Sequence, residues 1–552
     1  MEMTGGQALA QQLVREGVRH VFGIPGVQLD WATDALLDVA DSLHYVVPRH
    51  EQATSYMADG YARSSGEIGV CMVVPGPGLL NAMAGLATAY ACSSRLLCIS
   101  GQIPSATIGR GLGMLHEVRN QSTMLGSVTK WSALATTPAE IPGLVNEAFR
   151  QLRSGHPRPV GLEIPPDVLQ ARAEVELLDP APMDLPAEAD AAALQRAAAL
   201  LRSARFPVIF AGGGAVAAHA DAALRRLGEL LQAPVVTSPN GYGALPTEHP
   251  LALSALGGRC VLPHADVVLV VGSRFLDAHG VPVPIAPGAS IIYLNIEPAD
   301  LGAPRLPGLA LCADARCGLE RLAECLDGLS PPPRQAMVAQ VRAWCDQQLA
   351  FIEPQMSYVR ALRSALPDDG VLVGEMTQVG YASGLAFPVR MPGSYLHAGY
   401  QGTLGFGFPS ALGAATADPQ RPVISINGDG GFGWNLQELA TLARDRPRLV
   451  VVVFNDGAFG NVRRIQRGVF KREIATELHN PDFVALAEAF GLPASRVDSP
   501  AALEAAIRQA LQAGGPALIE VKVGEMPGPW HLIHSFSKAP RPAPPNPLGP
   551  AT

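Results

Sequence analysis

The sequence predicts an α/β fold with three domains, each built on a parallel sheet flanked by helices. Short β-branched runs alternate with Ala- and Leu-rich stretches along nearly the whole chain. The runs are apolar throughout, which is typical of strands buried on both faces of a parallel sheet. With 552 residues, 48% of them apolar and 16% charged, the chain is long enough to form several large cores.

Two breaks in this pattern set the domain boundaries. The stretches 177–190 and 329–335 are rich in proline and lack hydrophobic periodicity, so they are predicted to be linkers. The predicted domains are residues 1–175, 190–330 and 350–535, followed by a Pro-rich tail, 536–552, that can form neither helix nor sheet. Strands are expected at 70–74, 96–100, 208–211, 267–271, 291–296, 423–426 and 450–454.

A weak internal repeat relates the first and third of these domains. Residues 73–88 and 426–441 each combine a strand end, a Gly-x-Gly turn and a helical segment ending in Leu-Ala-Thr. The similarity suggests that the two domains share a topology.

The composition argues against several classes of protein. A formal net charge of -8 without a long basic run makes nucleic acid a poor partner. The eight cysteines include no C-x-x-C pair, which argues against zinc fingers and suits a reducing compartment. The polar N-terminus is not a signal peptide, and no apolar run approaches the ~20 residues that span a bilayer. We therefore expect a soluble, cytoplasmic protein with no membrane partner.

Two neighbouring strands of the third domain end in turns that carry oxygen ligands. The first ends in Gly-Asp-Gly-Gly, with Asp429, and the second in Asn-Asp-Gly, with Asn455. Parallel strands joined by a helix bring their carboxyl ends to one edge of a sheet, where α/β folds bind ligands. Carboxylate and amide oxygens are ligands that suit Mg²⁺. Because Gly428, Gly430 and Gly431 have no side chains, their backbone can come close to a phosphate group. The stretch predicts a metal-bridged diphosphate site; the alternative is a pair of ordinary turns.

The two turns also carry a resemblance to a known family. A helix with an apolar face over 436–443 is expected between them, and 26 residues separate Asp429 from Asn455. This pattern resembles the signature of thiamine diphosphate (ThDP) enzymes, and the chain resembles their acetolactate synthase-like branch over nearly its whole length. The resemblance implies a pyrimidine-binding, a central and a diphosphate-binding domain, in that order. It also implies ThDP and Mg²⁺ as cofactors, with Mg²⁺ held by Asp429, Asn455 and the backbone carbonyl of Gly457.

The same resemblance assigns activation of the cofactor to Glu51 and to the loop around Leu404. Glu51, in "PRHEQATSY", would hydrogen-bond the pyrimidine ring, so that the cofactor's own amino group removes the thiazolium C2 proton. Leu404 would wedge the cofactor into a bent shape, and the Gly402 carbonyl would accept from the amino group. The alternatives are an acid favoured at a helix N-terminus and an ordinary core leucine.

Other turns are expected to face the cofactor or the substrate. The resemblance suggests Gln28, His116 and Asn461 as substrate-side residues. Beyond the residues already named, it implies that ThDP contacts Pro25, Gly26, Pro75, Asn81, Val379, Gly380, Tyr381, Ala458 and Phe459. The chain departs from authentic acetolactate synthases in the loop "GRGLGMLHEVRNQ" and in its C-terminal lid, where "KVGEMPGPWHLIH" stands. These departures leave the substrate pair open.

The central domain carries a Gly-x-Gly-x-x-Ala turn after a strand. Gly212, Gly214 and Ala217 fit a dinucleotide fingerprint, but the next strand does not end in the acidic residue that NAD binding requires. The segment that follows is shorter than in acetolactate synthases and lacks their Met-His-Gly turn. NAD is therefore not predicted, and FAD is an option that the sequence does not favour.

The predicted function is a ThDP- and Mg²⁺-dependent, acetolactate synthase-like carboligase acting on a 2-oxo acid or an α-dicarbonyl compound. The alternatives are a decarboxylase or lyase that protonates its product, and a ThDP-fold protein that only binds. The resemblance further implies a homodimer or homotetramer with active sites at the subunit interface.

Overall fold

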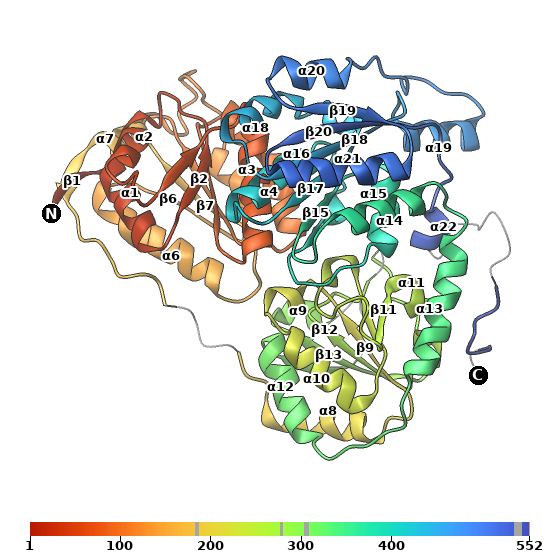
Figure 1. Ribbon diagram of the computed structural model, residues 1–552. Helices are drawn as coiled ribbons and strands as arrows, with labels where there is room; N and C mark the ends of the chain where they lie inside the picture. The colour runs from red at the N-terminus through yellow and green to blue at the C-terminus, as the bar shows by residue number, and fades with distance from the viewer. Residues whose placement is uncertain (183–186, 277–279, 303–307, 535–543, 551–552) are drawn as a thin grey trace.

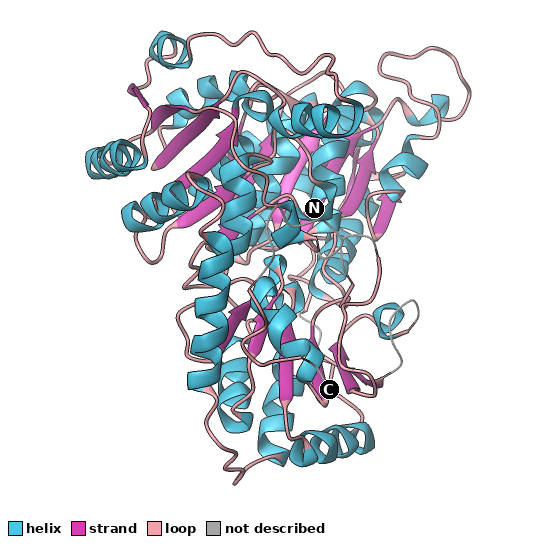
Figure 2. Ribbon diagram, turned by 90° about the vertical axis from the view of Figure 1, so that its right-hand side faces the viewer, coloured by secondary structure: helices cyan, strands magenta, loops and turns pink. Residues whose placement is uncertain are grey.

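The computed structural model describes residues 1–182, 187–276, 280–302, 308–534 and 544–550, and it confirms the predicted α/β class. Three six-stranded parallel sheets follow one another along the chain (Figure 1). A short antiparallel pair, β1 (Glu2–Thr4) and β8 (Arg172–Glu174), joins the start of the first domain to its end. Figure 2 shows the central domain beneath the other two.

The first and third sheets have the same strand order. In the first, the order is β3 (His44–Val46), β2 (His20–Gly23), β4 (Gly69–Val73), β5 (Leu96–Gly101), β7 (Val160–Ile164) and β6 (Trp131–Leu134). In the third, it is β16 (Tyr395–Leu396), β15 (Val371–Gly374), β17 (Val423–Gly428), β18 (Leu449–Asn455), β20 (Ala517–Lys522) and β19 (Ala494–Val497). Numbered within each domain, both orders are 2-1-3-4-6-5, so the shared topology suggested by the internal repeat is confirmed.

Helices flank both of these sheets. Those of the first domain are α1 (Gly5–Arg15), α2 (Asp30–Leu37), α3 (Glu51–Ser65), α4 (Pro77–Ala91), α5 (Gln121–Gly126), α6 (Ile141–Arg153) and α7 (Pro166–Gln170). Those of the third are α14 (Gln355–Ala365), α15 (Gln378–Ala386), α16 (Gly407–Ala417), α17 (Asp429–Phe432), α18 (Leu439–Asp445), α19 (Gly460–Phe470), α20 (Phe483–Ala489), α21 (Pro500–Ala513) and α22 (Trp530–Ile533).

The central sheet has the doubly wound order 3-2-1-4-5-6. Its strands are β11 (Ala252–Ser254), β10 (Val235–Thr237), β9 (Pro207–Ala211), β12 (Val267–Val271), β13 (Ser290–Asn295) and β14 (Leu309–Cys312). Its helices are α8 (Ala191–Ser203), α9 (Gly213–Ala217), α10 (Asp221–Leu231), α11 (Ala255–Val261) and α12 (Ala315–Cys325), and α13 (Gln335–Leu349) leads to the third domain. All the strands expected from apolar runs are present in the three sheets, with ends that differ by at most two residues.

The first and third domains pack against each other through α3 and α16, and glycines allow the close approach. A Cβ atom on Gly60 would lie 2.0 Å from the Ser410 carbonyl oxygen, and one on Gly413 would lie 1.9 Å from that of Met57. Side chains of both domains therefore share one hydrophobic core. This core fixes the turn before α3 relative to the third sheet.

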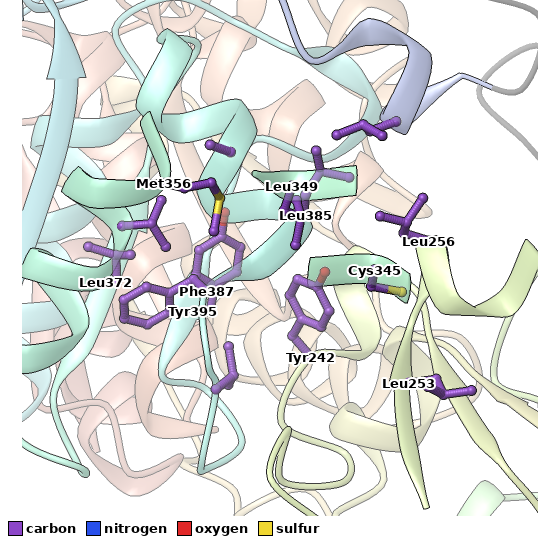
Figure 3. Packing of buried hydrophobic residues seen from close by; sticks show 14 of the residues in the cluster. Tyr242, Leu253, Leu256, Cys345, Leu349, Met356, Leu372, Leu385, Phe387 and Tyr395 are labelled. Carbon is purple, nitrogen blue, oxygen red and sulfur yellow. The ribbon is translucent and has the colours of Figure 1, made fainter. Parts of the chain in front are cut away.

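The central domain docks on the third through a second apolar core. Figure 3 shows Tyr242 of the central domain beside Tyr395 and Phe387. The Tyr242 ring meets that of Tyr395 edge to face at 5.7 Å, and its hydroxyl donates to the Gly384 carbonyl at 2.7 Å. Part of the predicted Pro-rich tail, 535–543 and 551–552, lies outside the described residues; Pro544 of the rest accepts a hydrogen bond from the Trp344 indole.

The described segments contain no helix that is both long enough and apolar enough to cross a membrane.

Candidate active site

Strands β17 and β18 place Asp429 and Asn455 at the carboxyl edge of the third sheet. The strands are adjacent and parallel, with Gly428 paired to Phe454, so Asp429 and Asn455 each lie one position beyond that pair. Both side chains are buried, 3% and 5% exposed. The predicted meeting of the two turns at one sheet edge is therefore what the fold produces.

The side-chain oxygens of these two residues face the same point. Asp429 Oδ2 and Asn455 Oδ1 share two donors: the N–H of Gly457, at 3.0 and 3.2 Å, and Asn480 Nδ2, at 2.6 and 3.1 Å. Asn455 Nδ2 donates to buried Glu520 at 2.7 Å, which leaves its oxygen directed toward Asp429. Burial raises the pKa of Asp429, and the hydrogen bonds from Asn480 and Gly457 oppose that rise.

This oxygen pair fits a hard divalent cation. Mg²⁺ binds through one or two carboxylates and keeps waters or phosphates as its remaining ligands. Asn480, which the sequence analysis missed, can offer its oxygen to the same point by turning its amide group. Gly457 meets the pair through its N–H, while its carbonyl accepts from Leu478 N at 2.9 Å. The role of that carbonyl as a metal ligand stays a prediction.

The helix expected over 436–443 between β17 and β18 is present, but a break separates it from the short helix that follows β17. The chain forms the short α17, a 3₁₀ turn (Leu436–Glu438) and then α18. Two buried side chains fix the break: Asn435 Nδ2 donates to the Gly405 carbonyl at 2.7 Å, and Glu438 accepts from the Arg49 N–H at 3.0 Å. Glycines at 430, 431 and 433 also weaken helix formation. A Cβ atom on Gly430 would lie 2.8 Å from a carbon of the Phe459 ring.

The first domain brings Glu51 and Asn81 together. Glu51 is the first residue of α3, and its Oε2 accepts from Asn81 Nδ2 of α4 at 3.0 Å. Within the described residues no hydrogen bond joins the Glu51 carboxylate to the third domain, although its neighbour Gln52 accepts from Asn435 at 3.3 Å. Glu51 is thus held at the domain boundary, with a half-buried side chain.

The loop from Gly402 to Gly407 presents Leu404 outside the core. Gly402 is exposed with φ +55°, and Leu404 is only half-buried, unlike the core leucines. Thr403 accepts from the Tyr56 hydroxyl at 2.9 Å, which anchors the loop to α3. This geometry suits a leucine that contacts a ligand.

A buried acid, Glu375, supports this loop and was not predicted from the sequence. It follows β15, is 2% exposed, and accepts the Gly405 N–H with one oxygen. Its other oxygen has no partner among the described residues, and Gly407 and Gly431 leave room for the carboxyl. Burial raises the pKa of Glu375 to about 8, so the acid is protonated at neutral pH. An acidic residue directly after a buried strand was the signal available.

Two substrate-side candidates of the first domain lie on contacting loops. Gln28 is 6% exposed and donates to the carbonyl of Leu115, the residue before His116, at 3.3 Å. His116 has φ +66°. Its carbonyl oxygen would lie 2.3 Å from a Cβ atom on Gly76. Of the other predicted contacts here, Pro75 is buried, Gly26 is half-buried and Pro25 is exposed.

The remaining predicted residues lie around α15 and α19. Val379 and Gly380 are buried in the first turn of α15, and Ala458 is buried before α19. Tyr381 meets the Trp530 ring edge to face at 4.7 Å. Asn461 accepts from Arg464 at 3.0 Å. Burial raises the pKa of Tyr381, and the positive charge of Arg464 lowers it, so the guanidinium acts on this phenol.

The glycine turn of the central domain lines a cavity between the three domains. The cavity, about 230 Å³, is bordered by Gly213 and Val216 of α9, by Arg63 and Arg95 of the first domain, and by His397 of the third. That FAD is not favoured as a ligand stays a prediction.

Family models of thiamine pyrophosphate enzymes match all three domains of the chain. Residues 3–124 match the model described as thiamine pyrophosphate enzyme, N-terminal TPP binding domain; residues 194–322 match the central domain; residues 375–521 match the C-terminal TPP binding domain. A probable 2-ketoarginine decarboxylase from Pseudomonas aeruginosa is 37% identical over 94% of each chain. The large subunit of acetolactate synthase isozyme 1 from Escherichia coli is 32% identical over 94% of each, and a probable acetolactate synthase large subunit from Methanocaldococcus jannaschii is 33% identical over 94% of this chain and 92% of its own.

Proposed function

Because the chain belongs to the ThDP-dependent enzymes of the acetolactate synthase-like family, we propose that it is a 2-oxo acid carboligase. In this reaction the bond between the carboxyl and the carbonyl carbon breaks, CO₂ leaves, and the remaining fragment joins an acceptor carbonyl. ThDP, when bound, supplies the electron sink that makes this cleavage feasible. The observation that carries the proposal is the convergence of Asp429 and Asn455 oxygens at the sheet edge.

The chain's own residues divide the work between binding and proton handling. Asp429 and Asn455, with Asn480 beside them, would hold Mg²⁺ and through it the diphosphate. Glu51, steadied by Asn81, would hold a proton at the pyrimidine ring. Leu404 would fix the shape of the cofactor, since Thr403 and the protonated Glu375 keep its loop in place.

The second candidate is a 2-oxo acid decarboxylase, in which the fragment left after loss of CO₂ takes up a proton instead of joining an acceptor carbonyl. The relative from Pseudomonas aeruginosa, named a probable 2-ketoarginine decarboxylase, supports it. The loop at His116 and the segment at Trp530, which depart from the acetolactate synthase pattern, support it too. Cleavage of an α-dicarbonyl compound without carboligation is the remaining alternative.

Product analysis separates these candidates. The protein, loaded with ThDP and Mg²⁺, is incubated with single 2-oxo acids and with pairs of a 2-oxo acid and an aldehyde. A new hydroxyketone that forms only when acceptor is present supports the carboligase, whereas aldehyde as the sole product supports the decarboxylase. Absence of any ThDP-dependent CO₂ release across the panel, 2-ketoarginine included, would contradict both.

We further propose a homodimer or homotetramer in which Glu51 of one chain meets Asp429 of another. Exposed apolar side chains beside both halves of the site support a covering partner: Val27, Leu80 and Leu115 in the first domain and Trp434, Val462 and Phe470 in the third. Such residues rarely stay exposed together on a monomer. The test is to mix inactive Glu51→Gln with inactive Asp429→Ala subunits. After verified subunit exchange, one site of a mixed dimer carries neither change, so partial activity should return.

A further inference from the structure

Arg464 forms no ion pair with a carboxylate in the part of the chain that the structure describes, although Glu525 lies near enough to act on its charge. Of its neighbours on α19, Arg463 lies 3.7 Å from Asp456, and Arg467 pairs with Glu473 at 2.6 Å and Glu525 at 3.1 Å. Among the described residues, Arg464 has no carboxylate within 4.0 Å, although its side chain is half-buried. A charge withdrawn from water without a counter-ion is costly, so its place in the fold calls for an anion.

A second unpaired donor lies beside it. The Nε of Arg464 and the indole Nε1 of Trp530 are both buried without an acceptor in the part of the chain that the structure describes. Both nitrogens lie beside Gly528, which has no side chain. A Cβ atom on Gly528 would lie 3.2 Å from Arg464 Nε and 3.1 Å from Trp530 Nε1. The guanidinium stands 5.4 Å from the centre of the Trp530 ring. A planar fork of N–H groups next to an indole N–H matches the geometry of a carboxylate.

This pair of donors lies next to the proposed reaction site. Arg464 also donates to Asn461 Oδ1, and Trp530 contacts the Tyr381 ring. Asn461 and Tyr381 are both among the residues predicted to face the cofactor or the substrate. The donors are thus joined by direct contacts to the residues expected to surround the reacting carbon.

We infer that Arg464 and Trp530 bind a carboxylate of the substrate, either the one next to the carbonyl or a second one at the far end. The inference rests on the proposed function, because it takes the substrate to be a 2-oxo acid. A substrate end that carries a cation does not fit this place, since it would meet the positive charge of Arg464 directly.

Binding of unreactive probes tests the inference separately from catalysis. The full chain, saturated with ThDP and Mg²⁺, is titrated with butanoate, glutarate and butylguanidinium while Trp fluorescence is recorded; Trp530→Phe identifies the indole that responds. We expect at least one of the two acids to bind, with Kd about 10- to 100-fold higher in Arg464→Met. Arg467→Met, on the same helix but paired with carboxylates, is the matched control and should stay within about twofold.

The probes also distinguish the two carboxylates. Equal weakening of butanoate and glutarate assigns Arg464 to the carboxylate next to the carbonyl, and weakening of glutarate alone assigns it to a second one. Arg464→Lys keeps the cation and should recover part of the affinity, which a misfolded Arg464→Met protein could not explain. Equal acid binding in parent and Arg464→Met, tight binding of butylguanidinium, or a loss of ThDP affinity in Arg464→Met would overturn the inference. Acid binding without turnover of any 2-oxo acid would instead contradict the proposed function.

Discussion

Replacing Glu375 by glutamine should remove a pH dependence from the stability of the third domain. Burial raises the pKa of this carboxyl group from its ordinary 4.5 to about 8. In the unfolded chain the same group titrates near its ordinary value. Between these two values the folded state holds a proton that the unfolded state has lost, so the free energy of unfolding falls as the pH rises.

The structure sets the size of this effect. Each pKa unit corresponds to 1.36 kcal/mol, so a change from pH 6 to pH 8 should cost the parent protein about 2 kcal/mol, after which the curve levels off. The Glu375→Gln side chain keeps the oxygen that accepts from Gly405 and has no titrating proton. Relative to the Glu375→Gln variant, the parent should lose roughly 4–8 °C in Tm between pH 6 and pH 8, at about 2–4 °C per kcal/mol.

Differential scanning calorimetry at pH 6, 7, 8 and 9 provides the measurement. The matched control is Glu504→Gln, which removes a half-buried carboxylate. Hydrogen bonds from Ser364 and Arg508 lower the pKa of Glu504. The Tm of Glu504→Gln should change with pH as that of the parent does, because Glu504 stays ionised between pH 6 and pH 9. If the Glu375→Gln and parent curves run parallel, Glu375 is ionised over the whole range and its assignment as a buried neutral acid is refuted.

Three further outcomes are expected. Asp429→Ala should weaken ThDP binding by about 100-fold or more, because it removes the charged member of the oxygen pair; calorimetry that shows unchanged affinity would contradict the metal site. Glu51→Gln should still bind ThDP but slow hydrogen–deuterium exchange at C2 by at least about 100-fold; NMR after acid quench that shows the parent rate would remove Glu51 from the mechanism. Gly413→Ala places a methyl group 1.9 Å from the Met57 carbonyl oxygen, so α16 must shift away from α3. Thermal unfolding should show a loss of about 1–3 kcal/mol, and an unchanged Tm would mean that the helix pair adapts freely.

The fold and the meeting of Asp429 and Asn455 could be predicted because local sequence determines them. Buried β-branched runs mark the strands, and a strand order common to parallel sheets brings Asp429 and Asn455 to one edge. Asn480 could not be found this way, since it reaches the pair from a loop without periodicity, 51 residues after Asp429. The break before Glu438 likewise depends on Arg49, 389 positions away in another domain. Contacts of that range leave no trace in a single sequence.

The core shared by the first and third domains sets the timing of folding during synthesis. Tyr56 of α3 and Leu518 of β20 belong to one core, although 462 positions separate them in the chain. At roughly 5–20 residues per second, a ribosome needs on the order of 20–90 s to make the second after the first. Throughout that interval the newly made first domain exposes the apolar side of α3, a surface that chaperones recognise and that aggregates when unprotected. Within each chain, the turn that carries Glu51 therefore takes its final position only after the strands that precede Asp429 and Asn455 have been made.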